Sequence, residues 1–190
     1  MEITDEILID LYKRMVRVRL FEEEAGRLAE SARLPGFLHL YVGEEAVASG
    51  VCAALENQDQ ITSTHRGHGH LLAKGGDFNR MMAELMGKST GYCNGKGGSM
   101  HICDLDLAML GANGIVGAGV PISVGAAYAN KLKKNGLISV AFLEMEQQIS
   151  ALSMKQPTWQ QPYLYQCFSF VRIMNTPNTV RETRRWLLRT

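Results

Sequence analysis

The stretch Leu137-Ile138-Ser139-Val140-Ala141-Phe142 is apolar at almost every position. Strands inside a parallel sheet are covered on both faces and have nearly continuous apolar sequences, whereas half-exposed strands alternate apolar and polar residues. The stretch therefore predicts a buried strand. The segment before it, residues 121–134, predicts a helix, and the two together favour a parallel sheet covered by helices.

The residues further upstream supply more helices and a second strand. A first helix is predicted to begin at Thr4-Asp5 and to end before Leu34-Pro35-Gly36, because proline disfavours helical backbone in the residue ahead of it. Other helices are expected from about residue 43 and from Asp77 to Met86, and a short strand is expected at Gln60-Ile61-Thr62. This order favours an α/β fold with an N-terminal helical segment. Ligands of such sheets bind at the carboxyl ends of the strands, so a site is expected just after Phe142.

Composition is typical of a globular chain and excludes several classes of function. Of the 190 residues, 46% are hydrophobic and 21% are charged, and the formal net charge is +1. This balance gives no basic surface for nucleic acid, and no apolar run approaches the about 20 residues that a membrane span needs. The four cysteines form no Cys-x-x-Cys pair. We therefore expect a cytoplasmic protein with reduced thiols and with neither a nucleic-acid nor a membrane partner.

The composition changes abruptly near residue 142. All 19 glycines lie in residues 1–142, and residues 143–190 contain none. The first part has 14 basic and 16 acidic side chains, a net charge of −2, whereas the second has six basic and three acidic side chains, a net charge of +3. We therefore treat residues 1–142 as one domain and residues 143–190 as a tail of different origin.

Glycine-rich segments are the first candidates for a binding site. Residues 87–101 contain five glycines, which cannot form regular structure cheaply, so they predict a long functional loop. Gly67, Gly69 and the loop 114–119 could let backbone amides approach a phosphate, with His65 and Arg66 supplying charge. The alternative is that these glycines only permit tight turns and close packing. The loop lacks the Gly-x-Gly-x-x-Gly order of nicotinamide sites.

Several histidines and carboxylates have both a functional and a structural interpretation. His65, His68 and His70 could bind a metal, but we favour histidines in a polar active-site loop, because no adjacent Cys or carboxylate completes the set. Cys93, His101 and Cys103 are a weaker metal candidate. His39 either bonds to backbone in the core or faces a substrate. A further group has bland interpretations: a solvated helix face for Glu22, Glu23 and Glu24, and core packing for Met81, Met82 and Met86.

Four ordered blocks between residues 5 and 142 strongly resemble one enzyme family. They are residues 35–46 (Pro-Gly-Phe-Leu-His-Leu-Tyr, then Gly-Glu-Glu-Ala), 65–69 (His-Arg-Gly-His-Gly), 95–101 (Gly-Lys-Gly-Gly-Ser-Met-His) and 113–117 (Asn-Gly-Ile-Val-Gly). The chain resembles the α subunit of the thiamine-diphosphate-dependent E1 components of 2-oxo acid dehydrogenases and acetoin dehydrogenases. The Thr64-His65-Arg66 segment is most similar to acetoin dehydrogenase.

The resemblance implies roles for particular residues. His65 and Arg66 would contact the cofactor diphosphate, Gly114 and Val116 would line the aminopyrimidine, and His39 would lie on the substrate side. The complete enzyme would cleave acetoin or decarboxylate a pyruvate-like 2-oxo acid and pass the acyl unit to a lipoyl-E2 partner. The resemblance also implies an E1 β subunit, which completes the site in a heterotetramer.

The chain departs from the family where the Mg²⁺ motif should begin. The family has Gly-Asp-Gly after this strand and Asn-Asn about thirty residues later, whereas Phe142 is followed here by Leu143-Glu144-Met145. Read one frame away, with suitable synonymous codons, residues 143–150 become Gly-Asp-Gly-Ala-Ala-Asn-Gln, and residues 172–175 become Glu-Asn-Asn-Glu. We therefore expect that residues 143–190 are an out-of-frame tail that truncates the domain. Such a chain would lack the Mg²⁺ ligands, bind thiamine diphosphate poorly and be inactive; the alternative function is a remnant that only docks a β subunit.

Overall fold

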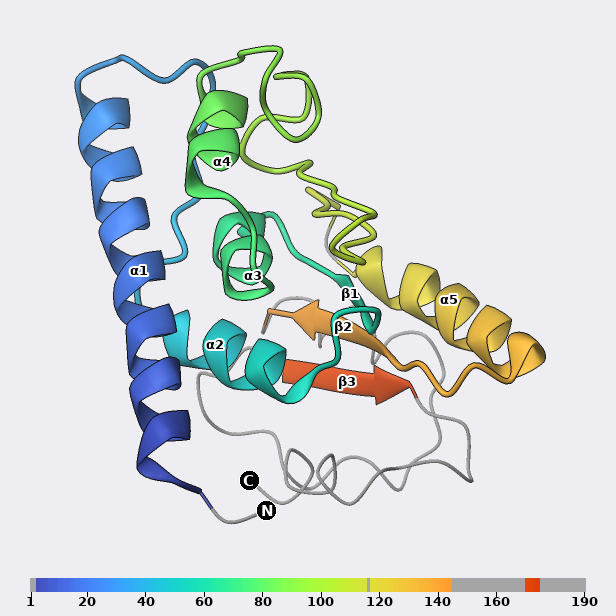
Figure 1. Cartoon of the computed structure of the whole chain (residues 1–190). Helices are drawn as coiled ribbons and strands as arrows, with labels where there is room; N and C mark the ends of the chain where they lie inside the picture. The colour runs from blue at the N-terminus through green and yellow to red at the C-terminus, as the bar shows by residue number, and fades with distance from the viewer. Residues whose placement is uncertain (1–2, 116, 145–169, 175–190) are drawn as a thin grey trace.

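A three-stranded sheet lies between helices on both sides of the molecule (Figure 1). The computed structural model describes residues 3–115, 117–144 and 170–174. The sheet has the order β1-β2-β3. The elements are α1 (Asp5–Glu30), α2 (Glu45–Ala54), β1 (Gln60–Thr62), α3 (Gly67–Ala73), α4 (Phe78–Leu85), α5 (Gly119–Lys133), β2 (Ser139–Leu143) and β3 (Phe170–Met174).

The parallel pairing of β1 with β2 confirms the predicted α/β arrangement. Ile61 lies opposite Val140 in the register, and both side chains are fully buried. The carboxylate of Asp59 accepts a 3.0 Å hydrogen bond from the backbone N–H of Ile138, which fixes the start of β2 beside the start of β1. Burial on both faces explains why the sequence of β2 is apolar at every position but Ser139.

The N-terminal helix packs on the core through its second half. Val18, Phe21, Ala25 and Leu28 are buried and recur at spacings of three and four residues. Leu8, in the first turns of the helix, is instead 52% exposed. The first turns of α1 extend past the other elements, so their apolar side chains have no core to cover (Figure 1).

The tail contributes one described strand to the sheet. Phe170–Met174 forms β3 and pairs antiparallel with β2, with Leu143 opposite Phe170 and Ser139 opposite Met174. Phe, Val and Ile in this segment supply the backbone preference that such main-chain pairing needs. Residues 145–169 and 175–190 lie outside the described part of the chain, so the out-of-frame origin stays a prediction.

Two glycines provide a matched test of the packing. A Cβ at Gly69 in α3 would overlap the ring of the buried Tyr41, whereas a Cβ at Gly50 in α2 would meet nothing within 4 Å. Gly69→Ala should lower the free energy of unfolding by about 2 kcal/mol or more through overpacking. Gly50→Ala should raise it by about 0.5–1 kcal/mol, because alanine favours helix. Urea denaturation measures both, and equal effects of the two substitutions would contradict the packing.

Candidate functional site

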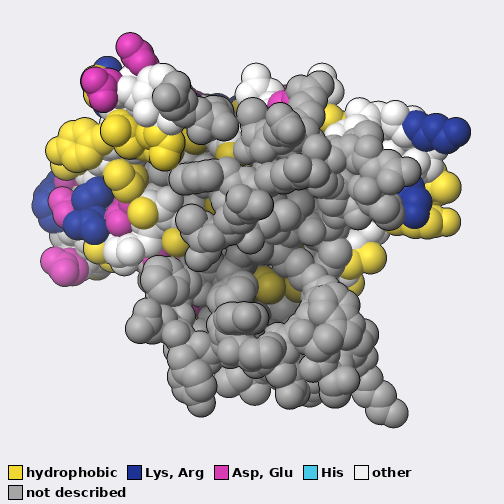
Figure 2. Space-filling view, turned by 90° about the horizontal axis from the view of Figure 1, so that it is seen from below, with side chains coloured by type: hydrophobic (Ala, Val, Ile, Leu, Met, Phe, Trp, Pro, Cys, Tyr) yellow, Lys and Arg dark blue, Asp and Glu magenta, His cyan; other side chains and the backbone are white. Residues whose placement is uncertain are grey.

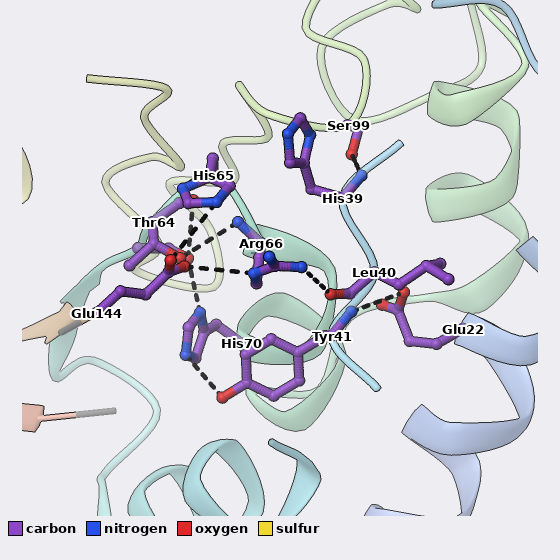
Figure 3. Close-up of polar contacts among 11 residues, drawn as sticks. Glu22, His39, Leu40, Tyr41, Thr64, His65, Arg66, His70, Ser99 and Glu144 are labelled. Carbon is purple, nitrogen blue, oxygen red and sulfur yellow. Dashed lines mark hydrogen bonds and ion pairs between the residues drawn. The ribbon is translucent and has the colours of Figure 1, made fainter. Parts of the chain in front are cut away.

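A cluster of charged side chains lies at the carboxyl ends of β1 and β2 (Figure 3). His65 and Arg66 follow β1, and Glu144 follows β2. Glu144 Oε2 lies 3.5 Å from His65 Nε2, and Glu144 Oε1 lies 3.7 Å from Arg66 Nε. Parallel strands end at the same edge of a sheet, which brings these residues together where a site was expected, and the assignment of a ligand site there stays a prediction.

The Arg66 guanidinium is held in place by the backbone. Its Nη1 donates a 2.6 Å hydrogen bond to the carbonyl oxygen of Leu40, and its own backbone N–H donates to Thr64 Oγ1 at 3.2 Å. The bond to Leu40 joins the loop after β1 to the segment that carries His39, and the bond to Thr64 lies within the loop. The side chain is therefore positioned with its Nε toward Glu144 (Figure 3).

His39 lies beside His65 at the rim of the same cluster. The two rings meet edge to face, with centroids 4.9 Å apart. Burial first, and then the charges of His65 and Arg66, lower the pKa of His39. The Nδ1 atom of His39 is buried and has no hydrogen-bond partner among the described residues. The ring is thus half-buried and edge to face with His65, and the role of His39 on the substrate side stays a prediction.

A buried chain of hydrogen bonds holds the backbone of His39 in position. Both carboxylate oxygens of Glu22 lie within 3.2 Å of His68 Nδ1, and His68 Nε2 lies 2.9 Å from Ser99 Oγ. Ser99 Oγ also accepts a 3.2 Å bond from the backbone N–H of His39, while Glu22 Oε2 accepts one from Tyr41. A carboxylate only accepts, so His68 donates from Nδ1 to Glu22, and its Nε2 shares a hydrogen bond with the Ser99 hydroxyl.

Glu22 corrects our interpretation of the three consecutive glutamates. Glu23 and Glu24 are exposed as expected, but Glu22 is 0% exposed. The sequence contains a signal that we did not use. Residue 22 falls within the buried stripe of Val18, Phe21 and Ala25, and a charge in an apolar stripe needs an internal partner.

The three histidines of residues 65–70 have separate partners. His68 and His70 lie on α3 and are fully buried, so they do not belong to a polar loop. His70 bonds to Tyr41 Oη at 3.0 Å and to Ser63 Oγ at 2.6 Å, and burial lowers its pKa to about 3. No group of three or more His, Cys, Asp or Glu side chains within the described ranges could hold a metal ion. The Cys93, His101 and Cys103 candidate falls under the same finding.

The glycine-rich loop 87–101 is organised by one carboxylate that sequence reasoning missed. Glu84, at the end of α4, is 0% exposed and accepts hydrogen bonds of 2.8–3.0 Å from four backbone N–H groups. The four donors are Cys93, Gly95, Gly97 and Gly98. A Cβ at Gly97 would come within 2.6 Å of a backbone oxygen, so the wrapping needs glycine. These four amides serve Glu84 and are not a phosphate cradle.

The remaining glycine candidates divide into two groups. Gly67 and Gly69 permit close packing: a Cβ at Gly67 would lie 2.6 Å from the Ala112 side chain. The packing alternative therefore applies to both of these glycines. The nearest neighbours of a Cβ at Gly114 belong to His101 and Met100. Val116 lies outside the described residues, and the roles of Gly114 and Val116 stay predictions.

Comparison with known proteins assigns the family. Residues 13–143 match the family described as the dehydrogenase E1 component. The chain belongs to this family.

The relatives it matches fall into two kinds. It is 55% identical over 142 residues to the α subunit of acetoin:2,6-dichlorophenolindophenol oxidoreductase from Bacillus subtilis, covering 75% of this chain and 43% of the relative. The same subunit of Cupriavidus necator is 50% identical over 72% of this chain and 41% of the relative. The pyruvate dehydrogenase E1 α subunit of Zymomonas mobilis is 46% identical over 72% of this chain and 39% of the relative. The chain thus spans about two fifths of the length of these curated relatives.

Among the described helices, none combines the length and apolar character that crossing a bilayer requires.

Adjacent glutamates on α1 test the buried chain of hydrogen bonds. Glu22→Gln keeps the shape but removes the charge that His68 and Tyr41 contact, so the free energy of unfolding should fall by about 1–3 kcal/mol. Glu23→Gln removes the same charge from an exposed side chain 3.8 Å from Arg19 and should change it by less than about 0.5 kcal/mol. Urea denaturation compares the two. A Glu22→Gln variant as stable as Glu23→Gln would refute the contribution of these buried hydrogen bonds to stability.

A second pair of variants tests the wrapping of the glycine loop. Glu84→Gln replaces one acceptor oxygen by an NH₂ group that faces amide donors, so it should lower stability by about 2–4 kcal/mol. It should also speed amide hydrogen exchange at Cys93, Gly95, Gly97 and Gly98. Glu30→Gln, at the exposed end of α1, is the charge-matched control. Unchanged exchange at these four amides would contradict the role of Glu84.

Proposed function

We propose that residues 1–142 are the first part of the α subunit of a thiamine-diphosphate-dependent E1 component. The complete subunit would act on acetoin or on a pyruvate-like 2-oxo acid and would transfer the acyl unit to lipoyl-E2. Family membership and the identities of 55% and 46% to acetoin and pyruvate enzymes support this proposal. The single observation that carries it is the convergence of His39, His65 and Arg66 at one edge of the parallel sheet.

The described residues fit the diphosphate only in part and do not fit the metal. His65 and Arg66 offer the positive charge that a diphosphate needs. The described part of the chain offers no carboxylate or histidine cluster for Mg²⁺, and Glu144 is already close to both cationic side chains. We therefore propose that this chain binds the cofactor weakly and is inactive by itself.

A shift of reading frame after residue 142 would account for this partial fit. The family match ends at residue 143, and the composition of the chain changes after residue 142. Loss of one base near that codon would replace the Gly-Asp-Gly segment and everything after it. This proposal explains why a chain with four intact family blocks lacks the metal motif.

The alternative function is a docking remnant that binds an E1 β subunit without cofactor. Helix α5 supports it, because Ile122, Val124, Tyr128 and Leu132 are 44–65% exposed. Figure 2 shows apolar side chains beside lysines at the end of the molecule that α5 forms. Exposed apolar surface of this kind often marks a protein interface. Co-purification with a β subunit would support this function, and failure to co-purify would count against it.

Restoring the frame tests the proposed function directly. The codons for residues 135–150 should be resequenced, and a variant with one base added after codon 142 should be expressed beside the chain as written. The restored chain should bind thiamine diphosphate with Mg²⁺ in calorimetry and gain activity with its β partner; the chain as written should show neither. Equal binding by both chains would refute the frame-shift explanation. Binding by neither, with the β subunit present, would refute the E1 assignment of the site.

A further inference from the structure

Glu144 lies where an anion would have to approach His65 and Arg66. Its two carboxylate oxygens lie 3.5 Å from His65 Nε2 and 3.7 Å from Arg66 Nε. The side chains of Glu144 and His65 are 18% and 17% exposed, and that of Arg66 is 34% exposed. The contact is therefore mostly sheltered from water, where charge pairs are screened less than on an open surface.

The carboxylate reaches the donors that an outside ligand would use. Arg66 Nη1 donates a hydrogen bond to the carbonyl oxygen of Leu40, so this part of the guanidinium group already has a partner. Two nitrogen atoms, Arg66 Nε and His65 Nε2, face Glu144 (Figure 3). A carboxylate and a phosphate present the same kind of charged acceptor oxygens to such donors.

The backbone holds Glu144 at this position. The residue before it, Leu143, is the last residue of β2 and pairs with Phe170 of β3, while Ala141 pairs with Thr62 of β1. Strand pairing on both sides limits movement of the main chain. An incoming anion would have to displace the Glu144 side chain by rotation about its own bonds, and it would keep a negative charge nearby.

We propose that Glu144 is an internal ligand that occupies the anion site formed by His65 and Arg66 and thereby weakens diphosphate binding. The inference rests on the proposed function for the identity of the anion, and it adds a cause of weak binding other than missing metal ligands. Removing the charge of the carboxylate removes its ion-pair contacts with His65 and Arg66 and its repulsion of an incoming anion. The three side chains keep some contact with water, where ion pairs are weak, so the gain in affinity should be about three- to tenfold.

The test is calorimetric titration of the full chain with inorganic pyrophosphate in the absence of Mg²⁺. Glu144→Gln should bind pyrophosphate about three- to tenfold more tightly than the unmodified chain, because the charge is removed while the shape is kept. Glu30→Gln, which makes the same change of net charge at the exposed end of α1, should bind like the unmodified chain. Adding Arg66→Gln to Glu144→Gln should abolish the gain.

Each outcome separates this inference from the function on which it rests. Equal, measurable binding by the unmodified chain and Glu144→Gln overturns the inference but leaves the anion site in place. No binding by either chain overturns the anion site and the inference with it. If Glu144→Gln does not fold, Glu144→Ala replaces it. The rise in melting temperature with added pyrophosphate then gives a second readout, which must be larger in the variant than in the unmodified chain.

Discussion

The rest of the site depends on the hydrogen bonds that the carboxylate of Glu84 accepts. It accepts four backbone amides and thereby gives the loop 87–101 a fixed path, although the loop contains little regular structure. The same loop carries Ser99, whose hydroxyl joins His68 to the backbone of His39. The position of His39, which lies between α1 and α2, thus depends on a residue of α4 that acts through a loop with little regular structure.

Three carboxylates of this chain illustrate how environment decides what a charge does. Glu22 and Glu84 are fully buried and bonded to the donors that would otherwise be buried without partners, so each one orders the segments around it. Glu144 is at the edge of the sheet, and its partners are the two cationic side chains of the candidate site. The first two carboxylates stabilise the fold around the site, whereas the third offsets the positive charge of the site itself.

The sequence predicted the larger features because they depend on local pattern. The apolar run at residues 137–142, the strand at residues 60–62 and the Asp77 cap all follow from periodicity or from capping chemistry, and the structure places each of them within a few residues. Glu84 could not be found in this way. Its partners are main-chain amides 9 to 14 residues away, and main-chain amides leave no trace in the sequence.

The site was predictable only in part. His65 and Arg66 stand out by type, and the carboxyl ends of parallel strands gave their location. Their contact with Glu144 was not predicted, because it joins segments that follow two different strands and depends on the register between them. The burial of Glu22 was within reach, since a helical wheel places it among Val18, Phe21 and Ala25. Reading the three glutamates as one run concealed this.

The parallel pairing also determines the order in which the chain can fold during synthesis. The bond from the Ile138 N–H to the Asp59 carboxylate joins residues 79 positions apart. During synthesis, β1 therefore cannot pair with β2 until most of the domain has been made. The other edge of β1 is completed sooner, because Ile61 exchanges backbone hydrogen bonds of 2.9 and 2.8 Å with Ala108 and Leu110. A nascent chain therefore has one open edge of β1 to protect until the ribosome has released residue 143.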